Sequence, residues 1–418
     1  MKTGIKPTWL ILLLACTFGC TGKSGQVGKT SFPSRPAAIA GEPKIVKAVF
    51  YIENSESMFG YVSNITEYVE VIAELAEMPE FIKDRVPREF NFINGTDPVI
   101  TPVRNDASVL KSKLNRAGFN CGDITKSNLN GMFQVALKNA GNGIISVLIS
   151  DGLYDIGGAG VTSLVTEGRG TRSQFINRLM TGDLQTIIIK LRSRFDGKYF
   201  YSSRRGAATI SGIRPYYIWI IGESRLLNRY FPNEYIPEKL KGYENMVRFV
   251  KPGTAGVPYQ ATADHSVGTF KFDREVINRL NDAKSDSHGQ GFQFSIAVDY
   301  SGLPYPDSFL SSPENYRVSS NYTITGIQKP AGKVHSVAFN PTHLITVKTM
   351  KYPAGKLVVS LVSNIPGWVR TTGTVTEDHI SQDSTHTYGF GYLINGIVEA
   401  YESVSENKSI AAFEIDIH

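Results

Sequence analysis

One carboxylate and two hydroxyls follow a short apolar stretch near the start of the chain, at alternate positions. The stretch, residues 48–52, is uninterrupted, which predicts a strand buried on both faces of a sheet. Glu53, Ser55 and Ser57 come directly after it. Open α/β sheets place their ligand sites at the carboxyl ends of their strands. Carboxylate and hydroxyl oxygens that converge there suit a hard divalent cation, which takes oxygen ligands and usually keeps some water.

Two later polar motifs also lie at the ends of predicted elements. Ser127 begins a Ser-Asn-Leu motif that precedes a helix expected to run to about residue 140. Asp151 lies in a Ser-Asp-Gly motif that ends a second buried strand, residues 144–149. Together with the motif that ends in Ser57, they resemble the metal-site motifs of von Willebrand factor A domains, in the family's order. That family usually has Asp-x-Ser-x-Ser, then Thr, then Asp, so Glu53 replaces an Asp and a Ser replaces the Thr.

The resemblance implies one divalent ion at the edge of the sheet. It would be Mg²⁺, or alternatively Mn²⁺ or Ca²⁺, bound by Ser55, Ser57, Ser127 and Asp151, with Glu53 as a direct or a water-mediated ligand. In the family an acidic side chain of a protein partner fills the open position on the ion, which is a reversible contact and not catalysis. The carboxylate of Glu53 reaches about 1.5 Å further than that of Asp. It either binds the ion directly or crowds it out.

The elements around these motifs alternate between strand and helix. This alternation predicts an α/β domain over residues 44–225, with a doubly wound, mainly parallel sheet of the von Willebrand A or Rossmann-like kind. Residues 192–212, between its last two strands, are basic and rich in Ser and Gly, which indicates a long exposed insertion or a hairpin. Residues 226–261 contain several prolines and are expected to form a connector. Residues 262–418 predict a β-sandwich-like module with one added helix at 388–403.

The N-terminus has the features of a targeting signal. Residues 1–19 combine two early lysines with a short apolar core, and they resemble a bacterial lipoprotein signal peptide. Cys16 is the preferred lipidation site, because Leu and Ala precede it at the third and first positions; Cys20 is the alternative. Residues 20–43 then read as a flexible tether. The expected location is the bacterial cell envelope, periplasmic or surface-exposed, and an ordinary secreted protein is the alternative.

Composition excludes some other classes of function. The 418 residues are 41% hydrophobic and 20% charged, as in an ordinary globular protein long enough for two domains. The formal charge of +6 includes Lys2 and Lys6 of the signal peptide, and without them +4 remains. That balance is too small to indicate a nucleic-acid partner.

Catalytic side chains are scarce in the first half of the chain. All seven histidines follow residue 260, so the predicted α/β domain contains no imidazole that could act as a base. Cys121 is the only cysteine outside the signal region, which excludes a disulfide framework. We therefore expect a binding protein, not an enzyme: a lipid-anchored envelope protein that holds a protein partner through the metal site. A metal-free scaffold with a degenerate site is the alternative, and a metal-dependent hydrolase that uses Asp151 comes third.

Overall fold

The computed structural model describes residues 42–157, 160–233, 236, 239–251, 256–319, 321–334, 337–404 and 408–418. The predicted signal peptide, Cys16, Cys20 and almost all of the predicted tether lie outside the described residues. Within the described ranges, no helix has both the length and the apolar character needed to cross a membrane.

A mixed seven-stranded sheet forms the first part of the structure. Its strand order is β3-β2-β1-β4-β6-β5-β7. The strands are β1 (Lys47–Glu53), β2 (Arg88–Asn94), β3 (Val99–Val103), β4 (Ile144–Ser150), β5 (Gln185–Phe200), β6 (Ala207–Gly222) and β7 (Tyr243–Val250). The α/β class was predicted correctly, but the sheet is not mainly parallel: β1 pairs in parallel with β2 and β4, and the other four pairs are antiparallel.

The antiparallel part of the sheet arises from a tight connection. β5 and β6 pair along their whole length, from Gln185 opposite Gly222 to Phe200 opposite Ala207. Only residues 201–206 join them, whereas a parallel pair needs a crossover of a dozen or more residues. Of the two structures expected for residues 192–212, the hairpin is therefore the one that forms.

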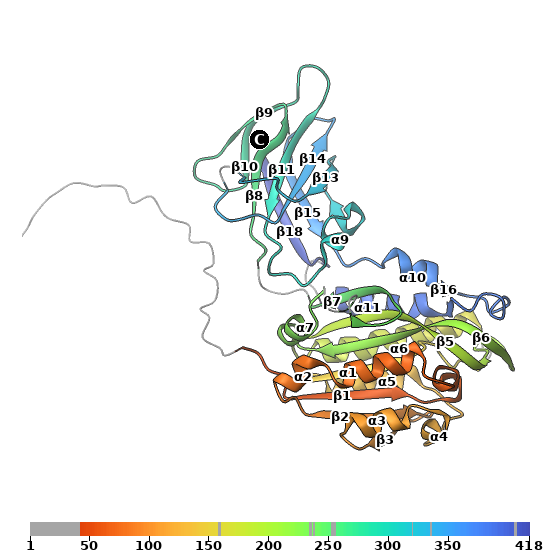
Figure 1. Ribbon diagram of the computed structural model, residues 1–418. Coiled ribbons are helices and arrows are strands. Elements are labelled where there is room, and N and C mark those ends of the chain that lie inside the picture. Colours follow the sequence, from red (N-terminus) through yellow and green to blue (C-terminus); the bar gives the residue numbers. More distant parts are fainter. Residues whose placement is uncertain are drawn as a thin grey trace, which may run out of the picture. The chain divides into compact units, whose positions relative to one another are not determined.

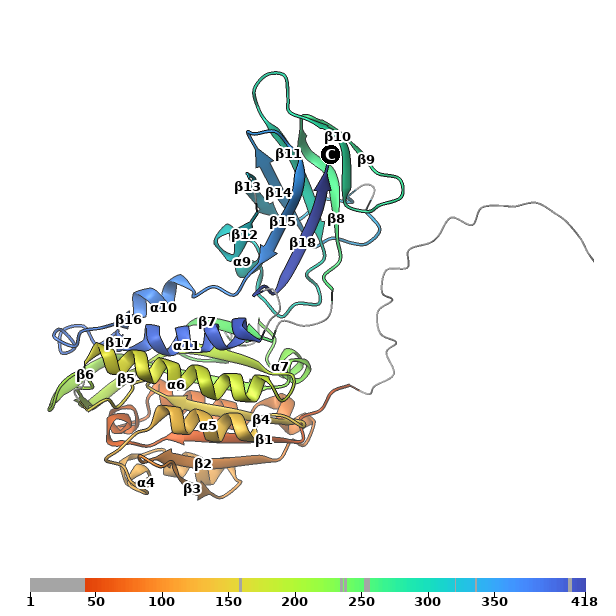
Figure 2. The same ribbon diagram turned by 180° about the vertical axis from the view of Figure 1, so that it is seen from behind.

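Helices cover both faces of this sheet. Figures 1 and 2 show α1 and α3 on one face, and α5, α6 and α11 on the other. The helical elements up to residue 230 are η1 (Glu56–Val62), α1 (Glu67–Ala76), α2 (Pro79–Lys83), α3 (Ala107–Lys113), α4 (Arg116–Phe119), α5 (Leu129–Asn139), α6 (Val161–Leu179) and α7 (Ser224–Tyr230). Strand β1 is buried on both faces as a result, which matches its uninterrupted apolar sequence.

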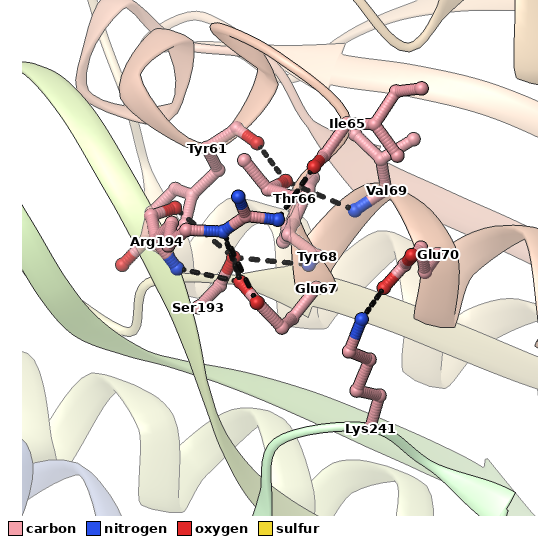
Figure 3. A network of polar contacts seen from close by, with 10 residues as sticks. All are labelled: Tyr61, Ile65, Thr66, Glu67, Tyr68, Val69, Glu70, Ser193, Arg194 and Lys241. Atoms are coloured by element: carbon pink, nitrogen blue, oxygen red, sulfur yellow. Dashed lines mark hydrogen bonds and ion pairs between the residues drawn. The ribbon is translucent and has the colours of Figure 1, made fainter.

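Polar contacts fix the start of α1 to β5 (Figure 3). Glu67 accepts hydrogen bonds from the backbone N–H of Arg194 at 2.9 Å and from its Nε at 3.2 Å. The Oγ of Ser193 accepts the backbone N–H of Tyr68 at 3.1 Å, and Lys241 Nζ donates to Glu70 Oε2 at 2.7 Å. These bonds hold the segment that follows Ser57 against the sheet.

Two elements beyond residue 225 join the α/β part, a strand that the sequence did not predict and the helix expected at 388–403. β7 pairs with β5, so the predicted connector contains the edge strand of the sheet. α11 (Phe390–Ser403) packs against α6, and its buried side chains belong to the same apolar core as those of the sheet. Gly168 and Gly396 allow this approach, because a Cβ at Gly396 would overlap the carbonyl oxygen of Gly168.

The remaining strands form two further sheets around a separate core. Their strand orders are β12-β15-β18-β10-β9 and β13-β14-β11-β8, and their pairs are antiparallel except β10 with β18. Apolar side chains of both sheets make one cluster, as expected for a sandwich-like module. The strands are β8 (Tyr259–Val267), β9 (Thr269–Phe272), β10 (Arg279–Lys284), β11 (Phe292–Val298), β12 (Tyr316–Val318), β13 (Thr323–Gln328), β14 (His343–Thr349), β15 (Gly355–Leu361) and β18 (Ala411–Ile417).

Short elements lie between these strands and helices in the sequence. They are α9 (Asp307–Leu310), η2 (Pro313–Asn315), α10 (Gly367–Thr372) and the two-stranded pair β16 (Gly373–Thr374) and β17 (Thr387–Tyr388).

Candidate metal-binding site

One cavity of about 430 Å³ is lined by all five residues that the sequence singled out. Glu53 ends β1, Ser55 and Ser57 follow it, Ser127 precedes α5, and Asp151 follows β4. The parallel register of β1 and β4 places Ile52 opposite Ile149, so the polar residues after both strands emerge at one edge of the sheet.

The hydroxyls of the site surround one oxygen of Glu53. The hydroxyls of Ser55 and Ser127 each donate to Glu53 Oε1 at 2.7 Å. The Oγ atoms of Ser55 and Ser57 are 3.0 Å apart. Glu53 Oε2 is buried and has no hydrogen-bond partner among the described residues. A buried carboxylate oxygen without a partner is costly, so this atom is available to a ligand.

Two carboxylates are buried in this small volume. Glu53 is 1% exposed and Asp151 is 2% exposed. Burial, and then the negative charge of Asp151, raise the pKa of Glu53 from 4.5 to about 7, although nearby serine hydroxyls act in the opposite direction. Burial also raises the pKa of Asp151. The pair therefore favours a bound proton or a bound cation over two free negative charges.

Backbone contacts fix Asp151. Its Oδ1 accepts the backbone N–H of Leu153 at 3.2 Å, which closes a turn directly after β4. Gly152 has φ 72° in this turn, and a side chain there would meet the ring of Tyr217. The sharp turn needs glycine, and it keeps the Asp151 carboxylate at the end of the strand.

A buried amide network positions Ser127. Asn54, which is fully buried, donates through Nδ2 to the carbonyl oxygens of Phe119 at 2.8 Å and Cys121 at 2.9 Å. Asn94 Nδ2 donates to Asn54 Oδ1 at 3.0 Å and to Cys121 O at 2.7 Å. The loop that ends at Ser127 is thus attached to the ends of β1 and β2. Neither asparagine was singled out from the sequence, although each lies at or next to the end of a predicted strand.

Arg214 is a third residue that the sequence analysis missed. It is 1% exposed, and its guanidinium carbon lies 4.5 Å from the centre of the Tyr199 ring and 5.4 Å from that of Phe195. Its Nη1 and Nη2 have no hydrogen-bond partner among the described residues. The positive charge of Arg214 lowers the pKa of Asp151, against the larger effect of burial. The signal that could have identified it is a charged residue directly before the apolar and aromatic run of residues 215–221.

The turn between β5 and β6 forms a further wall of the cavity. The lining residues from this region are Phe200 at the end of β5 and Tyr201, Ser202, Arg204, Arg205 and Gly206 of the turn, and the two buried carboxylates line the same cavity. The basic character of residues 192–212 was noted from the sequence, but nothing in the sequence placed this turn beside Asp151.

The donor set fits a hard cation. It offers two carboxylates and three hydroxyls, all oxygen ligands of the kind that Mg²⁺, Mn²⁺ and Ca²⁺ accept. The unpartnered Oε2 of Glu53 is the atom that a cation would engage first. Across the described ranges, no cluster of three or more His, Cys, Asp or Glu residues is arranged to hold a metal ion, so the fit rests on this mixed set.

The cavity lining differs from active sites that use an imidazole base or a thiol nucleophile. Its described residues include no histidine and no cysteine, so neither an imidazole base nor a thiol nucleophile is at hand. Comparison of the chain with protein-family models finds no match, and comparisons with curated proteins and with solved structures find no significant similarity. The resemblance of the motifs to von Willebrand factor A domains therefore stays a prediction.

Proposed function

We propose that this chain is a lipid-anchored protein of the bacterial cell envelope that binds a protein partner through a divalent ion. The ion, Mg²⁺ or alternatively Mn²⁺ or Ca²⁺, would be held by Glu53, Ser55, Ser57, Ser127 and Asp151. The observation that carries the proposal is the buried, unpartnered Oε2 of Glu53 beside Asp151 in a shared cavity.

The electrostatics of the site support a cation. Two carboxylates that are almost fully buried repel each other, because a protein interior screens charge less than water does. A bound divalent ion would offset both charges and supply an electrophilic position for an acidic side chain of the partner. The hydroxyls of Ser55, Ser57 and Ser127 would turn their oxygens toward the ion, instead of donating among themselves and to Glu53.

The proposed protein is not an enzyme, and it does not bind nucleic acid. The cavity lining mixes acidic and basic side chains, whereas a nucleic-acid surface would be uniformly basic. The proposed membrane attachment rests on the N-terminal sequence. It is tested by labelling with a fatty-acid analogue in cells that express the Cys16→Ala and Cys20→Ala variants. Label that persists in both single variants and in the double variant would overturn it.

A metal-free scaffold is the second candidate, and one observation favours it. Arg214 already supplies a buried positive charge that lowers the pKa of Asp151, and Glu53 with a pKa of about 7 can carry a proton at neutral pH. Such a site would be stable without an ion. A hydrolase built on Asp151 is less favoured, because no histidine is among the described residues that line the cavity.

Calorimetric titration of the full chain with Mg²⁺, Mn²⁺ and Ca²⁺ separates these candidates. We expect one ion per chain, with binding abolished by Asp151→Ala. Asp155→Ala is the matched control: Asp155 lines the same cavity but lies outside the proposed ligand set, so binding should be retained. Absence of binding by all three ions would leave the metal-free scaffold. Turnover of phosphoester or ester substrates that Asp151→Ala abolishes would instead support the hydrolase.

A further inference from the structure

The β5–β6 turn presents two arginines to the cavity that holds the candidate metal site. Arg204 and Arg205 both line this cavity, as do Glu53 and Asp151. They belong to the short connection between β5 and β6, residues 201–206, so their backbone is held by the paired strands. The lining therefore combines acidic side chains with a basic part, the arginine wall, which Arg204 and Arg205 form.

A buried carboxylate holds this turn in place. Glu377 is 4% exposed, and it accepts the backbone N–H of Ser202 at 3.1 Å and that of Ser203 at 2.6 Å. The hydroxyl of Tyr199 also donates to it. Hydrogen bonds from two successive backbone N–H groups to a carboxylate are charge-assisted and strong. The turn is thus fixed before a ligand arrives, which reduces the entropy lost on binding.

Both guanidinium groups are available to a ligand. Arg204 lies 4.1 Å over the ring of Tyr201, and its pair with Asp378 is 3.4 Å long with both side chains at least half exposed. An exposed pair of this kind contributes little and exchanges easily. Arg205 is exposed and forms no ion pair with any residue that the structure describes.

The charges of the lining show what a bound ion would change. Among the described lining residues, the acids are Glu53, Glu56, Asp151 and Asp155, and the bases are Lys126, Arg204 and Arg205. Acids outnumber bases by one in this lining, and the buried positive charge of Arg214 that acts on Asp151 offsets the difference when every acid is ionised. A divalent ion bound by Glu53 and Asp151 would make the balance positive. Such an ion would favour an anion at the arginine wall.

We propose that Arg204 and Arg205 form a second anion subsite, so that the ligand is an acidic peptide segment with two carboxylates. One carboxylate would complete the coordination of the ion, and the other would pair with the arginine wall. Arginine suits this task because its planar fork binds a carboxylate through two parallel hydrogen bonds. At about 430 Å³ the cavity lies within the range of ligand pockets and exceeds the need of one carboxylate. The inference rests on the proposed metal-dependent function and adds the class of ligand.

Two end-blocked fluorescent peptides test this subsite on the full chain. Gly-Glu-Gly-Glu-Gly carries two carboxylates, and Gly-Glu-Gly-Gln-Gly carries one. Fluorescence anisotropy in Mn²⁺ should show that the first peptide binds about tenfold more tightly, since its second carboxylate gains charge-assisted hydrogen bonds. The double variant Arg204→Ala/Arg205→Ala should remove this preference and leave the affinity for the second peptide unchanged. Lys198→Ala, an exposed change on β5 outside the cavity lining, is the control.

Each outcome separates the subsite from the metal site. Metal-dependent binding with equal affinities for the two peptides would overturn the subsite and leave the proposed function in place. Binding of the first peptide that persists in chelator and is lost in the double arginine variant would support the arginine wall, while it would overturn the role of the ion. No binding of either peptide, together with no calorimetric binding of any ion, would overturn both.

Discussion

Glu53 and Asp151 leave neighbouring parallel strands and line the same cavity, where the charge of Asp151 raises the pKa of Glu53 to about 7. Neither residue forms an ion pair of 4.0 Å or less with a basic side chain among the described residues. Buried carboxylates usually have such partners. Two buried carboxylates in one cavity are electrostatically unfavourable, and the first prediction addresses this pair.

Glu53→Gln should weaken ion binding about tenfold or more, because it removes one negative charge from a poorly screened position. The change keeps the length of the side chain and an oxygen that accepts from Ser55 and Ser127. Calorimetric titration with Mn²⁺ measures the effect. Glu56→Gln, in the same cavity lining but less buried, should change the affinity little. Equal losses in both variants would show that the site acts only through its overall charge.

Arg214→Met should strengthen ion binding by a factor on the order of ten, since it removes a buried positive charge that acts on Asp151. Arg214→Lys retains the charge and should leave the affinity near that of the unmodified chain. Thermal unfolding checks that both variants fold. An unchanged ion affinity in Arg214→Met would mean that the guanidinium serves only to pack against Tyr199 and Phe195.

Asn54→Ala should lower the free energy of unfolding by about 2–3 kcal/mol, because it removes the buried side-chain donor to the carbonyl oxygens of Phe119 and Cys121 and one acceptor of Asn94 Nδ2. The loop that carries Ser127 should loosen as well, so ion affinity should fall in the same variant. Urea denaturation and calorimetry provide the two readouts. Asn120→Ala, an exposed change in the same loop, should stay within about 0.5 kcal/mol. A loss of stability without a loss of affinity would exclude a positioning role for Asn54.

Glu67→Gln should destabilise the protein at neutral pH but not in acid. Burial alone would raise the pKa of Glu67, but the backbone N–H and the side chain of Arg194 hold it below 4.5 (Figure 3). A lowered folded pKa gives stability that is present above 4.5 and is lost as the pH falls through the folded pKa.

We expect a difference of about 0.5–1 kcal/mol at pH 7, since the pair is partly exposed. Urea denaturation of both chains at pH 7 and at pH 3 measures it. Glu74→Gln, exposed on the same helix, is the control and should show no such pH dependence. A difference that persists at pH 3 would contradict the ionic origin of the effect.

Gly396→Ala and Gly391→Ala should change stability in opposite directions, although both lie in α11. A Cβ at Gly396 would overlap the backbone of Gly168, which should cost about 1–3 kcal/mol. A Cβ at Gly391 meets nothing within 4 Å, so alanine should add about 0.5–1 kcal/mol through helix propensity. Thermal unfolding of the two variants measures the direction and size of each change in stability. Similar shifts in both would show that α11 does not depend on close contact with α6.

In the α/β part, the sequence predicted well the strands that are buried on both faces of the sheet. β1 and β4 are uninterrupted apolar runs, and the structure has both of them within one or two residues of the predicted bounds. Strand direction was not predictable in this way, because an apolar run is the same in a parallel and in an antiparallel pair. β7 was missed because its sequence, Tyr-Glu-Asn-Met-Val-Arg-Phe-Val, is neither a continuous apolar run nor a strict alternation, and because it lies among prolines.

The sequence also did not predict which helix α11 packs against. The apolar face of the helix was visible, but such a face does not specify which core it covers. Its contact with α6 depends on two glycines more than two hundred residues apart.

In the cavity, too, the sequence identified some residues and missed others. The places of Glu53, Ser57 and Asp151 at strand ends followed from the motifs, and the structure brings them to one cavity. Arg204 and Arg214 did not follow, because they reach the site through strand pairing between distant segments. Whether the five predicted residues bind an ion stays a prediction.

The distance in sequence between α11 and β18 and the elements that they pack with has a consequence for synthesis. α11 covers α6 in the first core, and β18 is the central strand of its five-stranded sheet, between β15 and β10. Both elements are translated after the other described helices and strands of their cores, so the first core is not complete before residue 403 is made, nor the second before residue 417. A stop codon just before residue 390 would therefore leave two unfinished cores and not one intact domain. Quality-control proteases should remove such a product as a whole.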